Sequence, residues 1–147
     1  MGSVAAVRIG FVSGDDQVTL CASFSRRVAP QTTVVAPSVR VGTTPVLDVP
    51  TRDAMRRELF PISRVVVARA ADCPFLAGLE VTDLEGLRSA AKRLREFGTR
   101  AAVVAGLLVR GRVLDLVDDD GEVVAARHRA RFRRRASRVW PERTRRR

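Results

Sequence analysis

Short apolar segments alternate with amphipathic segments along most of the chain. Within each apolar segment hydrophobic residues follow one another without polar alternation, which is typical of strands in a parallel sheet covered on both faces. The pattern therefore predicts an α/β layered fold of the Rossmann type, with a mostly parallel sheet and helices on its faces. The predicted strands are residues 7–12, 32–36, 64–68 and 101–104.

Two of the three predicted helices lie in the first half of the chain. Ser13, with Asp16 three residues later, is a capping signal for a helix that runs to about Val28. A loop containing glycine and proline is expected over residues 37–50, and a short helix follows at residues 51–59.

The clearest helix begins at Thr82. Thr82 and Glu85 match the capping-box pattern, and Gly98 stands where a left-handed residue would end the helix. The opposite face carries charged residues, as a solvent-exposed helix surface would. The predicted hydrophobic face consists of Leu84, Leu87, Ala91 and Leu94.

A C-terminal β-hairpin completes the predicted fold. Residues 112–117 would pair with residues 122–126 around a turn at residues 118–121. Three consecutive aspartates precede Gly121 and suggest a calcium loop, but the glutamate expected at EF-hand spacing is missing. We therefore favour a turn.

The formal net charge of the 147-residue chain is +11, and it is concentrated near the C-terminus. Residues 127–147 contain eleven arginines and one glutamate, whereas residues 1–126 are nearly neutral. A segment so poor in apolar residues is not expected to fold. We therefore predict a partial α/β domain over residues 1–126 and a disordered Arg-rich tail over residues 127–147.

Two interpretations of this tail are open. Its arginines could bind phosphates while Phe132 and Trp140 stack on bases, which would make the chain a small basic nucleic-acid-binding protein. Alternatively, the tail has no selected role, because Lys92 is the only lysine among 27 basic residues, which indicates codon bias in a GC-rich gene. A frameshift in such a gene would also produce runs of arginine.

The two cysteines and the start of the chain bear on location. Cys21 and Cys73 are isolated thiols without the spacing of a metal or redox motif. The first apolar run is too short for a signal peptide or a membrane span. These features predict a cytoplasmic location and no membrane partner.

Five phrases of the sequence, taken in order from residue 7 to residue 126, carry a resemblance to a known family. On them the chain resembles the hydroxymethylpyrimidine and phosphomethylpyrimidine kinases of thiamine biosynthesis, members of the ribokinase superfamily. The resemblance covers the middle and later part of that family. The phrases are VRIGFVSG, TTVVAPSVRVGTTPVLD, LFPISRVVV, VTDLEGLRSAAKRLREFGTRAAVVAG and GRVLDLVDDDGEV.

The resemblance implies a ribokinase-type fold, ATP and magnesium as cofactors, and a pyrimidine alcohol or its monophosphate as substrate. The family's Asn-x-x-Glu pattern, which supports magnesium, falls on Arg69 and Asp72, so Asp72 is the candidate residue for metal and cofactor binding. The pattern Val-Lys-Gly-Gly-His falls on residues 104–108, where Gly106 is a second candidate for cofactor binding.

Several functional groups of the family have no counterpart. A strand-end aspartate falls on Ala36 and a lysine on Ala105, while Arg69 places a cation where a neutral ligand belongs. The helix start Gly-Thr-Gly-Cys is absent after the hairpin. Because phosphoryl transfer depends on such charge-stabilising groups, we assign no catalytic residue and expect a truncated homologue that is inactive alone.

The same pattern predicts an association partner. Three helices cannot cover both faces of about four parallel strands, so some apolar surface should stay uncovered. We therefore expect a marginally stable chain that associates with itself, or with a complementary polypeptide, through a bare sheet edge or face.

Overall fold

A computed structural model describes residues 4–129 of the chain. Six strands form one sheet in the order β1-β2-β5-β6-β7-β8, while β3 and β4 form a separate ribbon. Neighbouring strands from β1 to β6 pair in parallel, and β6, β7 and β8 pair antiparallel, which confirms the predicted fold class. The strands are β1 Ala6–Ile9, β2 Thr32–Val35, β3 Arg40–Val41, β4 Thr44–Pro45, β5 Val65–Arg69, β6 Ala101–Val109, β7 Arg112–Asp119 and β8 Glu122–Arg129.

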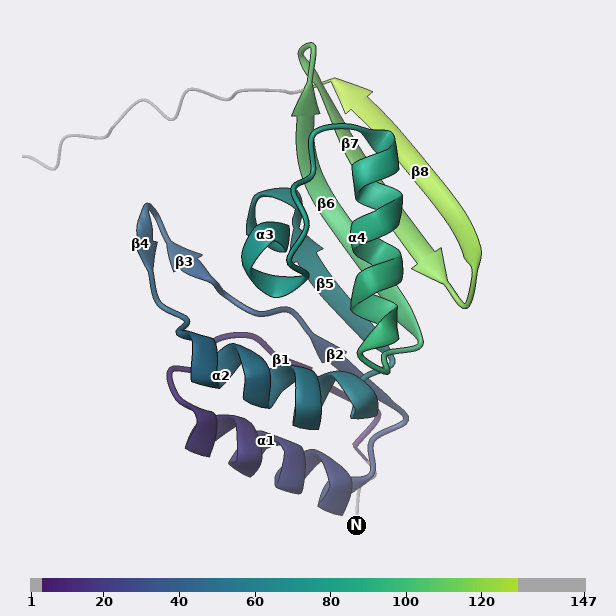
Figure 1. Cartoon of the computed structure of the whole chain (residues 1–147). Coiled ribbons are helices and arrows are strands. Elements are labelled where there is room, and N and C mark those ends of the chain that lie inside the picture. Colours follow the sequence, from purple (N-terminus) through teal and green to yellow (C-terminus); the bar gives the residue numbers. More distant parts are fainter. Residues whose placement is uncertain (1–3, 130–147) are drawn as a thin grey trace, which may run out of the picture.

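The helices lie on one side of the sheet, as Figure 1 shows for α1, α2 and α4. The chain advances along the sheet in one direction, and right-handed crossovers of this kind place their helices on the same face. Among residues 4–129 no helix covers the other face, and none is long and apolar enough to cross a membrane. The helices are α1 Asp15–Val28, α2 Val49–Ala54, α3 Cys73–Leu76 and α4 Leu84–Glu96, with helical turns η1 Met55–Leu59, η2 Phe60–Ile62 and η3 Ala70–Asp72.

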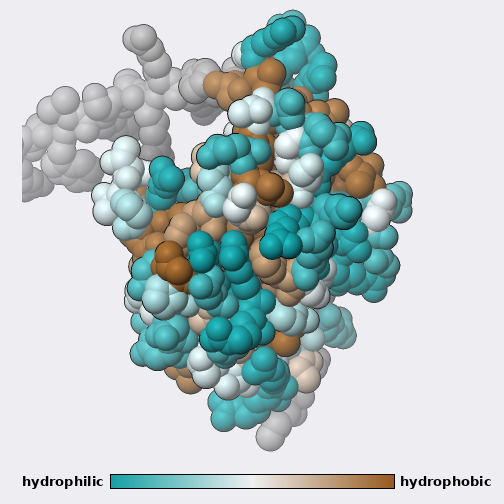
Figure 2. Space-filling model, in the orientation of Figure 1, coloured by the Kyte–Doolittle hydropathy of each residue, from teal (hydrophilic) through white to brown (hydrophobic). Residues whose placement is uncertain are grey.

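Burial along the strands follows this one-sided arrangement. Ile9, Val35, Val66 and Ala102 form a row across four strands on the helix side, and each is buried. The helix side of the molecule is mainly hydrophilic on its outer surface (Figure 2). As predicted, the described residues contain too few helices to cover both faces of the sheet. The face opposite the helices therefore has no helical layer.

That opposite face is apolar and open. Val117 is 38% exposed and Val124 is 59% exposed, and the strand register places them in one row with Val67 and Val103. The predicted uncovered apolar surface is therefore confirmed for residues 4–129. We call it the valine face, and it consists of Val34, Val65, Val67, Val103, Val117 and Val124.

Both predicted capping residues are wrong by one position. Helix α1 begins after Gly14, which makes no side-chain cap, and the amide of Ser13 instead donates to Gln17 Oε1 at 3.0 Å. Helix α4 is capped by Asp83, whose Oδ1 accepts from the Gly86 amide at 2.7 Å. The predicted end of α4 is confirmed, since Gly98 follows it with φ of +105°.

The loop predicted at residues 37–50 is more ordered than expected, because it contains the β3–β4 ribbon and the start of α2. Asp48 caps this helix by accepting from the Thr51 amide at 2.9 Å, and hydrogen bonds from Thr51 hold the pKa of Asp48 below its ordinary value. The helical path then continues without a break through η1 and η2.

The C-terminal part of the sheet contains two consecutive hairpins where the sequence predicted one. Strand β6 continues five residues beyond the predicted end and pairs with β7, with a register shift between Val104 and Leu107. Strand β8 continues to Arg129, so the first three residues of the predicted tail belong to the sheet. Residues 130–147 lie outside the described residues, and the hypotheses of disorder and nucleic-acid binding there stay predictions.

Candidate functional site

A crevice of about 290 Å³ opens near the carboxyl ends of β1, β2, β5 and β6. In open α/β sheets this edge is the usual place for a ligand. Apart from Ala68, the strand residues that line the crevice alternate with residues buried under the helices, so the crevice opens on the uncovered side of the sheet. Its floor is Ala36, Val67 and Ala105, and its polar rim is Arg8, Ser38, Arg40 and Arg69. We call it the arginine crevice.

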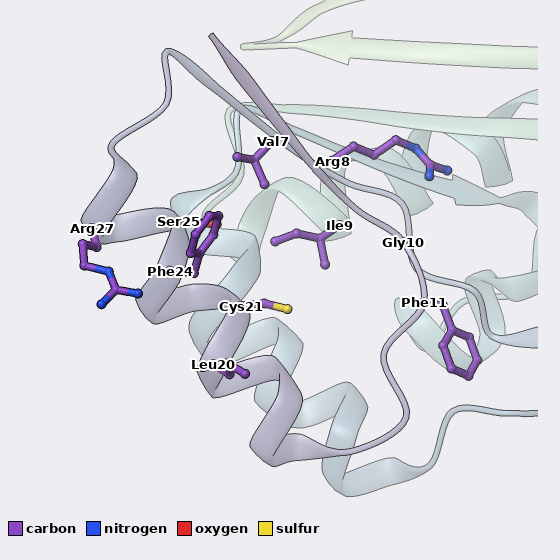
Figure 3. A pocket seen from close by; sticks show the side chains of 10 residues that line it. All are labelled: Val7, Arg8, Ile9, Gly10, Phe11, Leu20, Cys21, Phe24, Ser25 and Arg27. Carbon is purple, nitrogen blue, oxygen red and sulfur yellow. The ribbon is translucent and has the colours of Figure 1, made fainter. Parts of the chain in front are cut away.

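Arg8 reaches the crevice because of strand alternation. Its side chain points to the opposite side of β1 from Val7 and Ile9 (Figure 3). A Cβ atom on Gly10 would lie 3.2 Å from Nη1 of Arg8 and 3.9 Å from the carbonyl oxygen of Ala36. The guanidinium therefore lies over Gly10, beyond the end of β1, and a side chain at position 10 would press against it.

The rim of the crevice has an excess of positive charge. Neither Arg8 nor Arg40 has a carboxylate of residues 4–129 within salt-bridge distance, whereas Nε of Arg69 lies 2.6 Å from Oδ2 of Asp72. The rim thus has three guanidinium groups, and the one neighbouring carboxylate of the described residues that pairs with any of them is Asp72, which is bound to Arg69. Arginine forks of this kind suit phosphate oxygens, because they donate two parallel hydrogen bonds.

Asp72 was predicted to hold magnesium and the cofactor, and its surroundings do not suit that role. The residue is 2% exposed, one carboxylate oxygen is bound by Arg69, and Oδ1 has no hydrogen-bond partner among the described residues. No group of three or more potential metal ligands occurs in residues 4–129. Because magnesium needs several oxygen ligands and a cation already holds this carboxylate, the residues present do not fit a magnesium ion.

Gly106, the other predicted cofactor-binding residue, lies in the irregular part of β6. Its φ is +82°, and its amide donates to Oδ1 of Asp115 at 2.7 Å. The amide is therefore used within the sheet. The neighbouring Ala105, where the family pattern has lysine, lines the floor of the arginine crevice.

Sequence reasoning missed Arg8 and Arg40. Arg8 is the one charged residue of β1, and such an interruption in an apolar run was an available signal. Arg40 lies in a segment interpreted from the sequence as a loop. In the structure this segment forms the β3–β4 ribbon, which places Arg40 at the crevice. Neither position could be joined to Arg69 without the order of the strands.

Two further cavities lie elsewhere in the described part of the chain. A groove of about 450 Å³ between β1 and α1 is lined mostly by apolar side chains, among them the exposed Phe11, Leu20 and Phe24 (Figure 3). A second basic cavity of about 420 Å³ lies at the tip of the β6–β7 hairpin and includes Arg110, Arg112 and Arg127. The first offers little chemistry, and the second lies apart from the parallel strand ends.

Cys73 and the aspartates before Gly121 are protected by burial or engaged by other side chains. Burial raises the pKa of the Cys73 thiol to about 12, so this residue is not a nucleophile at neutral pH. Asp118 and Asp120 accept hydrogen bonds from the guanidinium of Arg95 at 3.0 and 3.1 Å. Asp118 and Asp120 therefore bind a side chain of α4, Asp119 pairs with Arg64, and the three shape a turn, in agreement with the interpretation favoured from the sequence.

A comparison with protein families matches residues 2–136 to the family described as phosphomethylpyrimidine kinase. No curated protein matches the chain. The fold is similar to many solved structures, and the chain spans about half the length of those compared below.

Three of these structures illustrate the similarity. Bacillus subtilis pyridoxal kinase, as an ADP complex, has 22% identity and a TM-score of 0.76, with 86% of this chain and 49% of that chain covered. Staphylococcus aureus pyridoxal kinase in complex with AMP-PCP has 21% identity and a TM-score of 0.77, with 85% and 47% covered. Phosphomethylpyrimidine kinase from Clostridium difficile 630 has 15% identity and a TM-score of 0.73, with 82% and 53% covered.

Proposed function

Because the chain belongs to the phosphomethylpyrimidine kinase family, we propose that it is the phosphate-binding portion of a kinase for a pyrimidine alcohol or its monophosphate. The observation that carries this proposal is the arginine crevice at the carboxyl ends of the parallel strands. We propose that it binds the phosphate groups of ATP or of the phosphorylated pyrimidine, and that the chain by itself does not transfer phosphate.

The shape and chemistry of the crevice support a small phosphorylated ring as ligand. Its volume of about 290 Å³ suits a small molecule, and the floor of Ala36, Val67 and Ala105 offers an apolar surface to a planar ring. The guanidinium groups on the rim would hold the phosphate by charge-assisted hydrogen bonds, each contributing about 1.5–3 kcal/mol. Two of the similar structures are complexes with ADP and with AMP-PCP, which is consistent with a nucleotide ligand.

The chain's own residues can bind and neutralise phosphate but supply little else. Guanidinium groups would stabilise charge on a transferring phosphoryl group. No general base is available in the crevice, since none of the described Asp, Glu or His residues lines it and the neighbouring Asp72 is buried and paired with Arg69. Removing one well-placed charge-stabilising donor commonly lowers a rate by about 10²–10³, and several donors of the family are absent together. The isolated chain should therefore show no kinase activity.

Calorimetric titration of the purified chain with ATP and with hydroxymethylpyrimidine phosphate tests the proposed function. We expect both ligands to bind with dissociation constants of about 1 mM or tighter, because three charge-assisted contacts of about 1.5–3 kcal/mol each provide at least about 4 kcal/mol. A parallel assay of ADP release with hydroxymethylpyrimidine should show no turnover. Failure of both ligands to bind would contradict the binding proposal, and turnover that depends on the pyrimidine would contradict the proposed inactivity.

The proposal includes a complementary polypeptide that covers the valine face. The chain spans about half the length of the similar kinases, and its helices cover one face of a parallel sheet that needs cover on both. We therefore propose the other half of the kinase scaffold as the occupant of this face, on the same or on a separate polypeptide. A parallel sheet with one exposed apolar face should cause the isolated chain to associate.

Light scattering across a range of protein concentrations tests this part of the proposal. We expect the isolated chain to form indefinite, concentration-dependent assemblies, and the double substitution Val117→Thr and Val124→Thr to reduce them strongly. Threonine keeps the shape and strand preference of valine while making the exposed face more polar, so stability should change by less than about 1 kcal/mol.

Val41→Thr is the matched control, because Val41 is 62% exposed on β3, which belongs to the separate β3–β4 ribbon and not to the six-stranded sheet. It should leave the assemblies unchanged. A discrete dimer that dissociates in the double variant would make a second copy of the chain the occupant. A stable monomer at every concentration would contradict the proposal that the valine face drives association of the isolated chain.

A further inference from the structure

The arginine crevice contains a cation at the position where the family pattern places a neutral partner of magnesium. That position is Arg69, and Arg8 and Arg40 add two further guanidinium groups to the same rim. We propose that this crevice binds phosphate directly through its arginines, without a divalent cation, and that magnesium weakens the binding. The inference rests on the proposed phosphate-binding function and specifies how that function is carried out.

The pairing of Arg69 with Asp72 supports direct binding. Nε of Arg69 donates to the buried Oδ2 of Asp72 at 2.6 Å, which fixes the plane of the guanidinium at the end of β5. The two terminal Nη groups make no hydrogen bond within residues 4–129, and the side chain is 58% exposed. A guanidinium held by a carboxylate on one edge and open on the other is oriented to donate to a phosphate.

The other two arginines extend the positive rim. Arg8 lies over Gly10, and Arg40 begins the β3–β4 ribbon. Neither has a carboxylate partner among the described residues, so a phosphate entering the crevice would displace only water from them. The described residues that line the crevice include three arginines and no acidic residue. Of the neighbouring carboxylates, Asp72 is paired with Arg69, and Asp115 accepts a hydrogen bond from the amide of Gly106.

The same arrangement opposes a divalent cation. Magnesium prefers several oxygen ligands in octahedral geometry, and the crevice offers one hydroxyl, from Ser38, and no free carboxylate. A metal placed among three guanidinium groups would be repelled. Magnesium bound to the ligand would also neutralise part of the phosphate charge that the arginines attract, so it should compete with the protein for the phosphate oxygens.

Titration of the full chain with inorganic pyrophosphate, once in EDTA and once in excess magnesium at matched ionic strength, tests the inference. We expect binding in EDTA and a several-fold weaker affinity in magnesium. Arg69→Asn and Arg40→Gln should each weaken binding in EDTA by about 10- to 100-fold, the loss expected for one charge-assisted contact. Circular dichroism should confirm that the variants are folded. Arg40 makes no side-chain hydrogen bond or ion pair within residues 4–129, so its replacement should carry little structural cost.

Arg112→Asn is the matched control, because it removes an arginine from the second basic cavity without touching the crevice. Its affinity for pyrophosphate should equal that of the wild type. Equal losses in Arg112→Asn and in the crevice variants would reveal unspecific attraction and overturn the inference. Binding that requires magnesium would overturn it while leaving the proposed function intact, whereas absence of ATP and pyrophosphate binding under both conditions would overturn both.

Discussion

Phe60→Ala is expected to lower the free energy of unfolding by about 3–5 kcal/mol, the range for removing a fully buried aromatic side chain. Phe60 is 0% exposed at the start of η2, and its ring centroid lies 6.1 Å from that of Phe97 in a tilted arrangement. Its side chain thus joins the helical segment before β5 to the end of α4. Truncation would leave a cavity between two layers that rigid helices cannot close.

The measurement is the midpoint of urea unfolding followed by circular dichroism, with the denaturant slope checked for two-state behaviour. Small domains are stable by about 5–15 kcal/mol, and this chain is expected to lie near the lower limit, so the variant should keep at most about 2 kcal/mol and unfold at low urea concentration. Phe11→Ala is the control, because Phe11 is 58% exposed. A loss below about 1 kcal/mol for Phe60→Ala would contradict the described packing.

The second large effect is expected for Arg95→Met, which should lower the free energy of unfolding by about 2–3 kcal/mol. Breaking a fully buried ion pair typically costs about 3–5 kcal/mol, and the loss should be smaller here because Arg95 is partly exposed. Arg95 extends from α4 and donates to Asp118, Asp120 and the carbonyl oxygen of Arg100. Asp118 is 5% exposed and would be left with the amide of Gly121 as its remaining partner. The penalty arises mainly from a buried carboxylate without its countercharge.

The same unfolding measurement with Arg93→Met provides the comparison. Arg93 lies on the same helix and pairs with Glu96, but both side chains are about half exposed, so the loss should stay below about 1 kcal/mol. Replacing Asp118 together with Arg95, as Asp118→Asn in the Met variant, should recover part of the stability because the uncompensated charge is gone. No recovery would indicate that packing of the Arg95 stem, rather than its charge, supports α4.

Much of the fold could be predicted because its signals are local. The apolar runs around Val66 and Ala102 are continuous because these strands form the middle of the sheet, and helix α4 shows a hydrophobic face and a terminal glycine within fifteen residues. The exact capping residues could not be predicted, since Thr82 and Asp83 are both good caps, and backbone geometry chose Asp83.

The candidate site was predicted only in part. Asp72 and Gly106 were identified by family pattern, and both lie near the strand ends where a ligand belongs, yet each is committed to another partner of the chain. Arg8 and Arg40 carry no local signature of function. Their role depends on strands and a ribbon that meet at one crevice although they lie far apart in the sequence.

The amino-acid sequence by itself determined the order of strands and helices, the terminal glycine of α4 and the membership of a kinase family, because these follow from short-range hydrophobic periodicity and from the order of motifs. Only the tertiary structure decided which face of the sheet stays open and which arginines meet in one crevice. The physical reason is that alternation along a strand sets two faces, but the handedness of the crossovers decides which face the helices cover.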